Sequence, residues 1–204
     1  MPPSHSTLTH APPISKAHTR RTAIVFASSL AFVPFADAAL TNNPDTKSKI
    51  DLTGSLFEKQ GTSTGTDPLL LYSIALAESG YCRGKGKIGP WPWTLRSNKA
   101  HYPESREAAE IKLNELIKSY GRVIDIGLCQ ANLFWHGHRV NKPEDLLDPQ
   151  TNLRVANQVL LESIASARGD LELGIGRYHH WTDPTRARNY GSRVLAIYRN
   201  LRTM

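Results

Sequence analysis

The sequence predicts a mainly α-helical fold, a single domain that follows an export signal. Segments with helical spacing of apolar residues succeed one another through short connections, and few segments show the alternation that strands require. Hydrophobic residues make up 40% and charged residues 21% of the 204 residues, an ordinary balance for a chain with one core. Each longer predicted helix begins at a side chain that favours the N-cap position: Asp67, Ser105, Asp148, Asp170 and Asp183.

The predicted helices follow from these caps. Residues 69–79 are apolar almost all round, which is typical of a helix inside a core, and Gly80 is expected to end it. Residues 123–132 are interrupted by glycine and predict a strand-like turn, while residues 85–93 predict a loop. The other expected helices are a short one within 50–59 and longer ones over 105–120, 149–168, 170 onward and 184–202.

The first 38 residues are typical of an export signal. An apolar run at 23–33 precedes a small-residue site that ends at Ala38. Because the run is shorter than the roughly 20 residues that span a bilayer, we expect cleavage near Ala38 and a periplasmic mature protein without a stable membrane span. A membrane anchor or a buried helix is the alternative, since the polar segment before the run is unusually long. Residues 39–55 are then a linker, and residues 56–204 form the domain.

The formal net charge of +7 suits a polyanionic partner, such as a cell wall rich in carboxylates, an anionic membrane or nucleic acid. Lysines and arginines are not clustered, which argues against nucleic acid. The histidine pairs His136/His138 and His179/His180 lack the spacing and companions of a zinc site. We therefore expect neither a metal nor a cofactor.

Glu78 breaks the pattern of its apolar helix. By helical spacing it shares a face with Leu71, Ile74 and Ala75, and glutamate is rarely buried without a reason. It also lies near the C-terminal end of the helix, where the macrodipole disfavours a negative charge. Both effects favour the neutral acid, which is the form that a general acid needs. The alternative is a structural glutamate that reaches solvent or pairs with an arginine such as Arg83.

Three short motifs follow one another along the chain. They read Glu-Ser-Gly at 78–80, Gly-Leu-Cys-Gln-Ala-Asn at 127–132 and Arg-Tyr-His-His at 177–180. In this order they resemble the soluble lytic transglycosylase (SLT) family, whose members share a goose-type-lysozyme-like helical fold. Residues 89–94 and 105–108 resemble a subgroup of that family associated with conjugation and pilus-assembly systems.

The resemblance covers about residues 56–202 and implies a peptidoglycan lytic transglycosylase. Glu78 would be the sole catalytic acid/base. It would protonate the glycosidic oxygen between N-acetylmuramic acid and N-acetylglucosamine, and then accept the C6 hydroxyl proton as a 1,6-anhydro ring closes. The implied partners are peptidoglycan glycan strands and, for the subgroup, proteins of a secretion or conjugation machine.

The resemblance also implies roles for other motif residues. Ser79 would offer its hydroxyl to the sugar, and Tyr178 would orient Glu78 by hydrogen bonding. His179 departs from the family, which commonly has asparagine there. The implied substrate-binding residues are Ser79, Gly127, Leu128, Gln130, Asn132, Tyr178 and His179.

Cys82 and Cys129 are the two cysteines of the chain. In an oxidising compartment an isolated pair predicts one disulfide, and two free thiols are the alternative. Cys129 stands where the family usually has methionine, and if the family fold holds, the two cysteines flank the cleft.

Asp125 is a candidate second carboxylate. Next to Glu78 it could position water and give a lysozyme-type hydrolase instead of a transglycosylase. The alternative is a turn residue bonded to nearby backbone amides. A third reading of the whole chain is a non-catalytic wall-binding assembly factor.

The four tryptophans could belong to the core or could stack on sugar rings. Trp91 and Trp93 lie in a loop rich in proline and glycine, and loops carry function more often than cores do. We therefore prefer these two as sugar contacts over Trp135 and Trp181.

Overall fold

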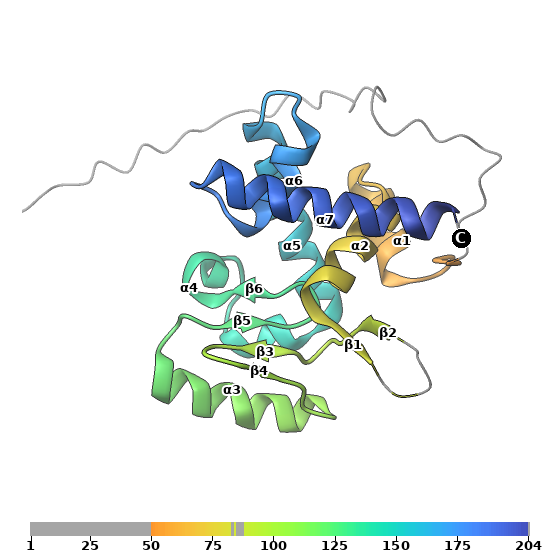
Figure 1. The fold of residues 1–204 in the computed structure, drawn as a ribbon. Coiled ribbons are helices and arrows are strands. Elements are labelled where there is room, and N and C mark those ends of the chain that lie inside the picture. Colours follow the sequence, from red (N-terminus) through yellow and green to blue (C-terminus); the bar gives the residue numbers. More distant parts are fainter. Residues whose placement is uncertain (1–49, 83, 85–87, 204) are drawn as a thin grey trace, which may run out of the picture. The chain divides into compact units, whose positions relative to one another are not determined.

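A computed structural model describes residues 50–82, 84 and 88–203 (Figure 1). The predicted signal at 1–38 and most of the predicted linker at 39–55 lie outside these residues. The described chain is mainly helical, as predicted, and none of its helices is long and apolar enough to cross a membrane. The helices are α1 (Leu56–Thr64), α2 (Pro68–Ser79), α3 (Arg106–Tyr120), α4 (Leu133–His136), α5 (Pro149–Ser166), α6 (Leu171–His179) and α7 (Pro184–Thr203), with 3-10 turns η1 (Gly137–Arg139) and η2 (Pro143–Leu147).

The predicted caps are confirmed. In each case the side chain accepts a hydrogen bond from a backbone amide in the first turn, a donor that has no partner within the helix. The expected stop at Gly80 is confirmed as well, and Gly121 caps the end of α3. The accepting side chains are those of Asp67, Ser105, Asp148, Asp170 and Asp183.

Two small antiparallel sheets join the helices. The predicted loop at 85–93 is partly wrong, because β2 (Ile88–Pro90) pairs with β1 (Gly80–Cys82) in a hairpin. The predicted strand-like turn at 123–132 is confirmed: it holds two strands of a four-stranded sheet. That sheet has the order β4-β3-β5-β6 and consists of β3 (Leu95–Arg96), β4 (Ala100–His101), β5 (Asp125–Ile126) and β6 (Ala131–Asn132).

The buried side chains form two clusters. The helical half, made of α1, α2, α5, α6 and α7, surrounds a cluster that includes Leu71, Ile74 and Leu160. The sheet half, made of α3, β3–β6 and η2, surrounds a second cluster that includes Leu95 and Leu113. In Figure 1 the sheet and α3 lie below the crossing of α2, α6 and α7. Helix α5 contributes side chains to both clusters and so ties the two halves together.

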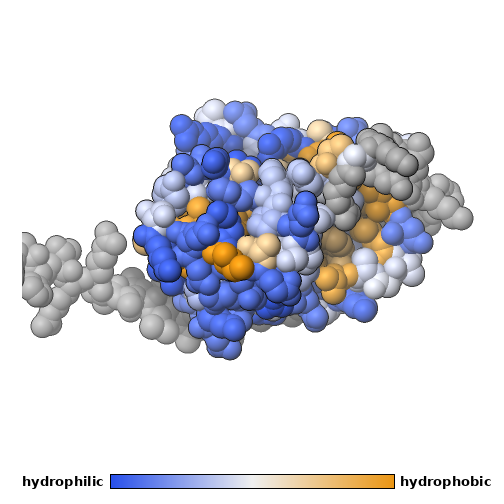
Figure 2. Space-filling model, turned by 90° about the horizontal axis from the view of Figure 1, so that it is seen from below, coloured by the Kyte–Doolittle hydropathy of each residue, from blue (hydrophilic) through white to orange (hydrophobic). Residues whose placement is uncertain are grey.

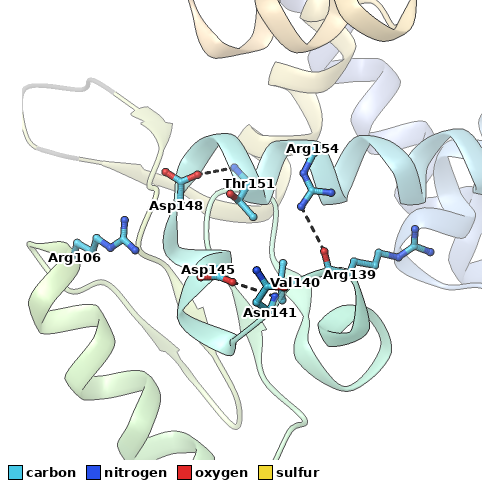
Figure 3. Close-up of a pocket in the computed structure, with 8 residues that line it drawn as sticks. All are labelled: Arg106, Arg139, Val140, Asn141, Asp145, Asp148, Thr151 and Arg154. Carbon is cyan, nitrogen blue, oxygen red and sulfur yellow. Dashed lines mark hydrogen bonds between the residues drawn. The ribbon is translucent and has the colours of Figure 1, made fainter.

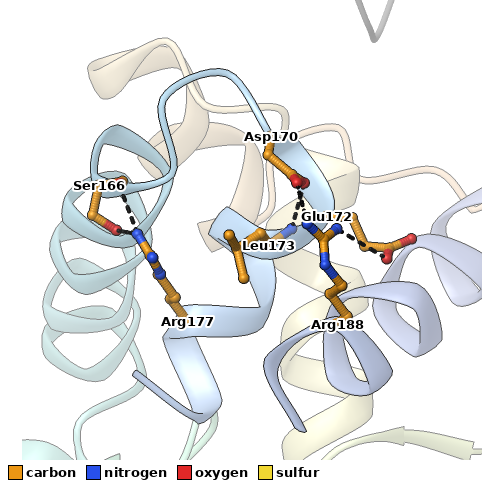
Figure 4. A network of polar contacts seen from close by, with 6 residues as sticks. All are labelled: Ser166, Asp170, Glu172, Leu173, Arg177 and Arg188. Carbon is orange, nitrogen blue, oxygen red and sulfur yellow. Dashed lines mark hydrogen bonds and ion pairs between the residues drawn. The ribbon is translucent and has the colours of Figure 1, made fainter. Parts of the chain in front are cut away.

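Polar contacts fix α6 between α5 and α7 (Figure 4). Arg177 donates from Nη1 to the backbone carbonyl of Ser166 at 2.7 Å and to its hydroxyl at 2.9 Å. Arg188 of α7 donates to Asp170, which caps α6, at 2.6 Å. Gly176 allows the close crossing with α7, since a Cβ there would lie 2.0 Å from the carbonyl oxygen of Ala187. The end of α6 is thereby held in place, and it carries the third sequence motif.

Candidate active site

Glu78 is the next-to-last residue of α2, and its side chain is only 10% exposed. Leu71, Ile74 and Ala75 are buried on the same helix, as the spacing predicted. The Glu78 Oε1 atom is buried and accepts no hydrogen bond from the described residues. A buried carboxylate oxygen without a donor is costly, so this atom is available to accept a hydrogen bond from a ligand. Arg83, the alternative structural partner, lies outside the described residues.

His179 is the charged neighbour of this carboxyl group. Its Nδ1 lies 3.6 Å from Glu78 Oε1, slightly too far for a formed hydrogen bond. The Glu78 carboxylate raises the pKa of His179, chiefly because it can accept a hydrogen bond from the protonated ring and further because of its negative charge. Burial acts in the opposite direction and lowers this pKa. The imidazole side chain is 55% exposed, so it connects the buried acid to solvent.

The Tyr190 ring of α7 packs face to face against the His179 imidazole. The two rings stack at 4.7 Å between centroids with an interplanar angle of 9°, and the Arg193 guanidinium lies 5.3 Å from the Tyr190 centroid. Burial and then the Glu78 charge raise the pKa of Tyr190 well above its ordinary value. Sequence analysis missed this role, because Tyr190, Val194 and Tyr198 have the spacing of an ordinary core face.

Asp125 contributes a second carboxyl group from β5. Burial raises the pKa of Asp125, the hydrogen bond from Asn132 lowers it, and the Glu78 charge raises it further. Asn132 Nδ2 donates to Asp125 Oδ1 at 2.7 Å, so the bond comes from a side chain and not from the backbone amides that the turn alternative supposed. Glu78, His179 and Asp125 thus form one electrostatically coupled group.

The three sequence motifs meet at the turn of residues 127–130, which we call the motif turn. Ser79 Oγ lies 2.6 Å from the carbonyl oxygen of Leu128 and donates to it. Tyr178 Oη donates to the next carbonyl, that of Cys129, at 2.7 Å. Segments about fifty residues apart are therefore joined directly beside Glu78.

These bonds change the roles expected for Ser79 and Tyr178. Ser79 is 1% exposed, and besides donating to the motif turn it accepts from the Trp91 amide at 3.2 Å. It therefore fixes the end of α2 and is not placed to reach a sugar. The Tyr178 hydroxyl bonds the motif turn and not Glu78. Tyr178 therefore does not orient Glu78 through a direct hydrogen bond, contrary to the expectation.

The motif turn is itself structural. Gly127 has φ +81°, and a Cβ there would lie 2.4 Å from Nδ2 of Asn152. Leu128 is buried in the helical cluster, and Gln130, with φ +51°, donates from Nε2 to the Thr94 and Gly127 carbonyls. Within the motif turn, the buried Gln130 Oε1 lacks a hydrogen-bond partner among the described residues. Of the expected substrate-binding residues, Gly127 and Leu128 build the turn.

Asn152 of α5 holds this turn, and sequence analysis missed it. Its Nδ2 donates to the carbonyls of Ile126 at 2.7 Å and Leu146 at 2.9 Å, and its Oδ1 accepts from the Cys129 amide at 2.8 Å. The side chain is fully buried. A polar residue at a core position of a predicted helix was the available signal.

The predicted disulfide is wrong: Cys82 and Cys129 are both free. Cys82 is exposed on the hairpin strand β1, opposite Ile88, whereas Cys129 is 1% exposed within the helical cluster. Burial raises the pKa of the Cys129 thiol, which keeps it protonated and unreactive. The sequence could not reveal that the two side chains occupy such different environments.

The preference among tryptophans also changes. Trp91 is partly buried, with Nε1 donating to the Pro103 carbonyl at 2.8 Å, and Trp93 packs against the sheet cluster. Trp135 and Trp181 are instead 68% and 56% exposed. The tryptophan surface available to a ligand therefore lies on α4 and on the α6–α7 turn.

A polar groove of about 420 Å³ opens on the sheet half (Figure 3). Its lining includes Arg106, Arg139 and Arg154 but none of the predicted site residues. Arg106 pairs with Glu110, and both guanidinium amino groups of Arg139 bond Glu162. The groove is thus separate from the group around Glu78.

The site combines a largely buried acid, a second carboxyl group and an accessible imidazole on a mainly helical domain. Among the described residues no three His, Cys, Asp or Glu side chains are grouped to hold a metal. Comparison with known proteins gives no identity: no family model, no curated protein and no solved structure matches the chain.

Proposed function

We propose that this protein is a peptidoglycan lytic transglycosylase, with a lysozyme-like fold, that uses Glu78 to cleave the bond between N-acetylmuramic acid and N-acetylglucosamine. The proposal depends above all on one observation: Oε1 of Glu78 is buried, accepts no hydrogen bond from a described residue and lies 3.6 Å from Nδ1 of the exposed His179. A carboxyl group that is shielded from bulk water and still open to a ligand suits a general acid. The order of the three motifs, joined at the motif turn, supports the same function.

The chemistry needs one carboxyl group that changes roles. Neutral Glu78 donates its proton to the glycosidic oxygen, and the bond to the muramic acid C1 breaks. The resulting carboxylate then accepts the C6 hydroxyl proton while O6 bonds to C1 and closes the 1,6-anhydro ring. Protonated His179, 3.6 Å from Oε1, stabilises the carboxylate between the two steps.

A lysozyme-type hydrolase is the second candidate, and Asp125 favours it. The Asp125 carboxyl group is coupled to both Glu78 and His179. If it held a water molecule at C1, the products would carry hydrated reducing ends instead of anhydro rings.

Mass spectrometry of the fragments released from purified sacculi tests the proposal. The parent chain should release muropeptides one water lighter than lysozyme products, and Glu78→Gln should release none. Glu104→Gln, at an exposed acid before α3, is the matched control and should retain full release. Hydrated ends would favour the hydrolase. Binding to sacculi without release would refute catalysis and favour a wall-binding assembly factor.

We further propose that the protein is exported and acts in the periplasm, where it opens gaps for a secretion or conjugation machine. Residues 1–38 and the motif resemblance support this location and role. N-terminal sequencing of the protein recovered from periplasmic extract should begin after Ala38. A chain that keeps its first residues and stays in the cytoplasm would refute the export proposal.

A further inference from the structure

Eight large apolar or aromatic side chains of the described residues are exposed, and five of them are aromatic. The face drawn in Figure 2 is predominantly hydrophilic, with separate apolar patches. Three of the exposed large apolar side chains are the aromatic residues Phe134, Trp135 and Trp181, which are 56%, 68% and 56% exposed. Exposed aromatic rings in such number need an explanation, because tryptophan and phenylalanine are among the residues that gain most from burial.

These three residues are tied closely to the group around Glu78. Trp181 lies two residues after His179, so their Cα atoms are at most about 7 Å apart. Phe134 and Trp135 lie in α4, whose N-cap Asn132 accepts from both of their amides and donates to Asp125. Trp181 therefore lies close to His179 along the chain. The aromatic residues of α4 are linked to Asp125 through the Asn132 side chain.

Other aromatic residues near the site have their rings engaged. Tyr81 stacks on Tyr102 at 4.5 Å between centroids, and Trp91 packs edge-on against Trp93 at 5.5 Å. Phe134 and Trp135 contact each other edge to face at 4.8 Å, which leaves ring surface open to solvent. Trp181 makes no ring contact with another described residue. The exposed tryptophan and phenylalanine rings of the described residues thus lie on α4 and the α6–α7 turn.

We propose that Phe134 and Trp135 on α4 and Trp181 on the α6–α7 turn are stacking subsites for the pyranose rings of a β-1,4-linked glycan strand. The occupant follows from its chemistry, since a pyranose presents an apolar C–H face to an aromatic ring and hydroxyls to its polar surroundings. Separate aromatic surfaces linked to one acid group suit a chain of such rings better than a compact ligand. The inference rests on the proposed function. It places one part of the glycan strand on α4, next to Asp125, and another part on the α6–α7 turn, next to His179.

Binding measured without turnover tests the inference. In a Glu78→Gln background of the full chain, titration calorimetry with a β-1,4-linked N-acetylglucosamine hexasaccharide gives the reference affinity. Adding Trp135→Ala or Trp181→Ala should weaken binding by about three- to tenfold each. Trp135→Phe should recover part of the loss because it keeps a ring. The matched control is Ile111→Ala, which removes an equally exposed apolar side chain from α3 and should leave the affinity unchanged.

The outcomes separate this inference from the proposed function. If the parent chain releases anhydro-muropeptides while both alanine variants bind the hexasaccharide normally, the subsites are refuted and the function stands. If binding depends on the two tryptophans but nothing is released from sacculi, the subsites stand and catalysis is refuted. A concentration-dependent dimer in sedimentation that Trp135→Ala abolishes, with unchanged sugar affinity, would refute the subsites and assign α4 to self-association.

Discussion

The helical half of this protein packs through long apolar helix faces, whereas the sheet half adds buried polar side chains that bond its backbone. In the helical half, Leu71, Ile74 and Leu160 come from helices whose starts are fixed by local caps. In the sheet half each strand has only two residues, and Asn152 and Gln130 complete the backbone bonding. The comparison shows that the seam between the halves, at the motif turn, is bonded by Ser79 of α2, Asn152 of α5 and Tyr178 of α6.

The largest effect should come from removing the polar bridge at this seam. Asn152→Ala removes three buried hydrogen bonds to the backbone and should lower the free energy of unfolding by about 3 kcal/mol. Asn157→Ala, five residues along α5, removes bonds only to the hydroxyls of Thr64 and Thr66 within the helical half. Because hydroxyls can rotate to new partners, its loss should be about 1–2 kcal/mol. Urea unfolding followed by circular dichroism measures both, and equal losses would remove the distinction between the halves.

The same comparison explains how much of the fold the sequence predicts. The caps at Asp67, Ser105 and Asp148 are local signals, so the long helices could be placed to within about two residues. The two-residue strands and the four-residue α4 are too short to show a periodic pattern. The three-residue hairpin strand β2 was missed for the same reason.

The site divides in a similar way. Glu78 was visible because a charged residue interrupts an apolar helix. Asp125 was visible only as a candidate, since its coupling to Glu78 depends on how β5 meets α2. Ser79 and Tyr178 were recognised by motif, but their bonding to the motif turn needed three-dimensional distances. Sequence analysis did not distinguish Tyr190 and Asn152 from ordinary helix positions.

A smaller effect should distinguish a structural Ser79 from a sugar-binding one. Ser79→Ala removes the bond to the Leu128 carbonyl and should lower the free energy of unfolding by about 1–2 kcal/mol. Ser73→Ala, on the same helix, loses only a bond to the Leu69 carbonyl four residues back and should cost less than about 1 kcal/mol. At a temperature where both variants are folded, KM for glycan should match the parent. A raised KM with unchanged stability would restore Ser79 to the sugar site.

A weaker effect should follow from the contact between His179 and Glu78. Because the pKa of His179 is raised in the folded protein, its stabilisation is full below about pH 6.5, the ordinary histidine pKa, and is lost as pH rises through the raised value. The ring is more than half exposed, so the gain should stay below about 1 kcal/mol. Melting temperatures of the parent and His179→Gln should therefore differ in mild acid and converge in mild alkali. Glu78→Gln should abolish the difference, and exposed His138→Gln should show none.

The smallest expected effect is that of reducing agent or of Cys82→Ser, and it tests whether the seam is held without a covalent link. A disulfide that closes a loop of this length would stabilise the fold by about 4 kcal/mol on the chain-entropy model, so reducing agent would lower the melting temperature markedly. With Cys82 exposed and Cys129 buried as free thiols, reducing agent and Cys82→Ser should each change the free energy of unfolding by less than about 0.5 kcal/mol. Cys129→Ser should cost about 1–3 kcal/mol in either redox state, because it buries a hydroxyl in the helical cluster. If Cys82→Ser and Cys129→Ser instead cause equal losses that appear only under oxidising conditions, a disulfide forms and hydrogen bonds alone do not hold the motif turn against α2.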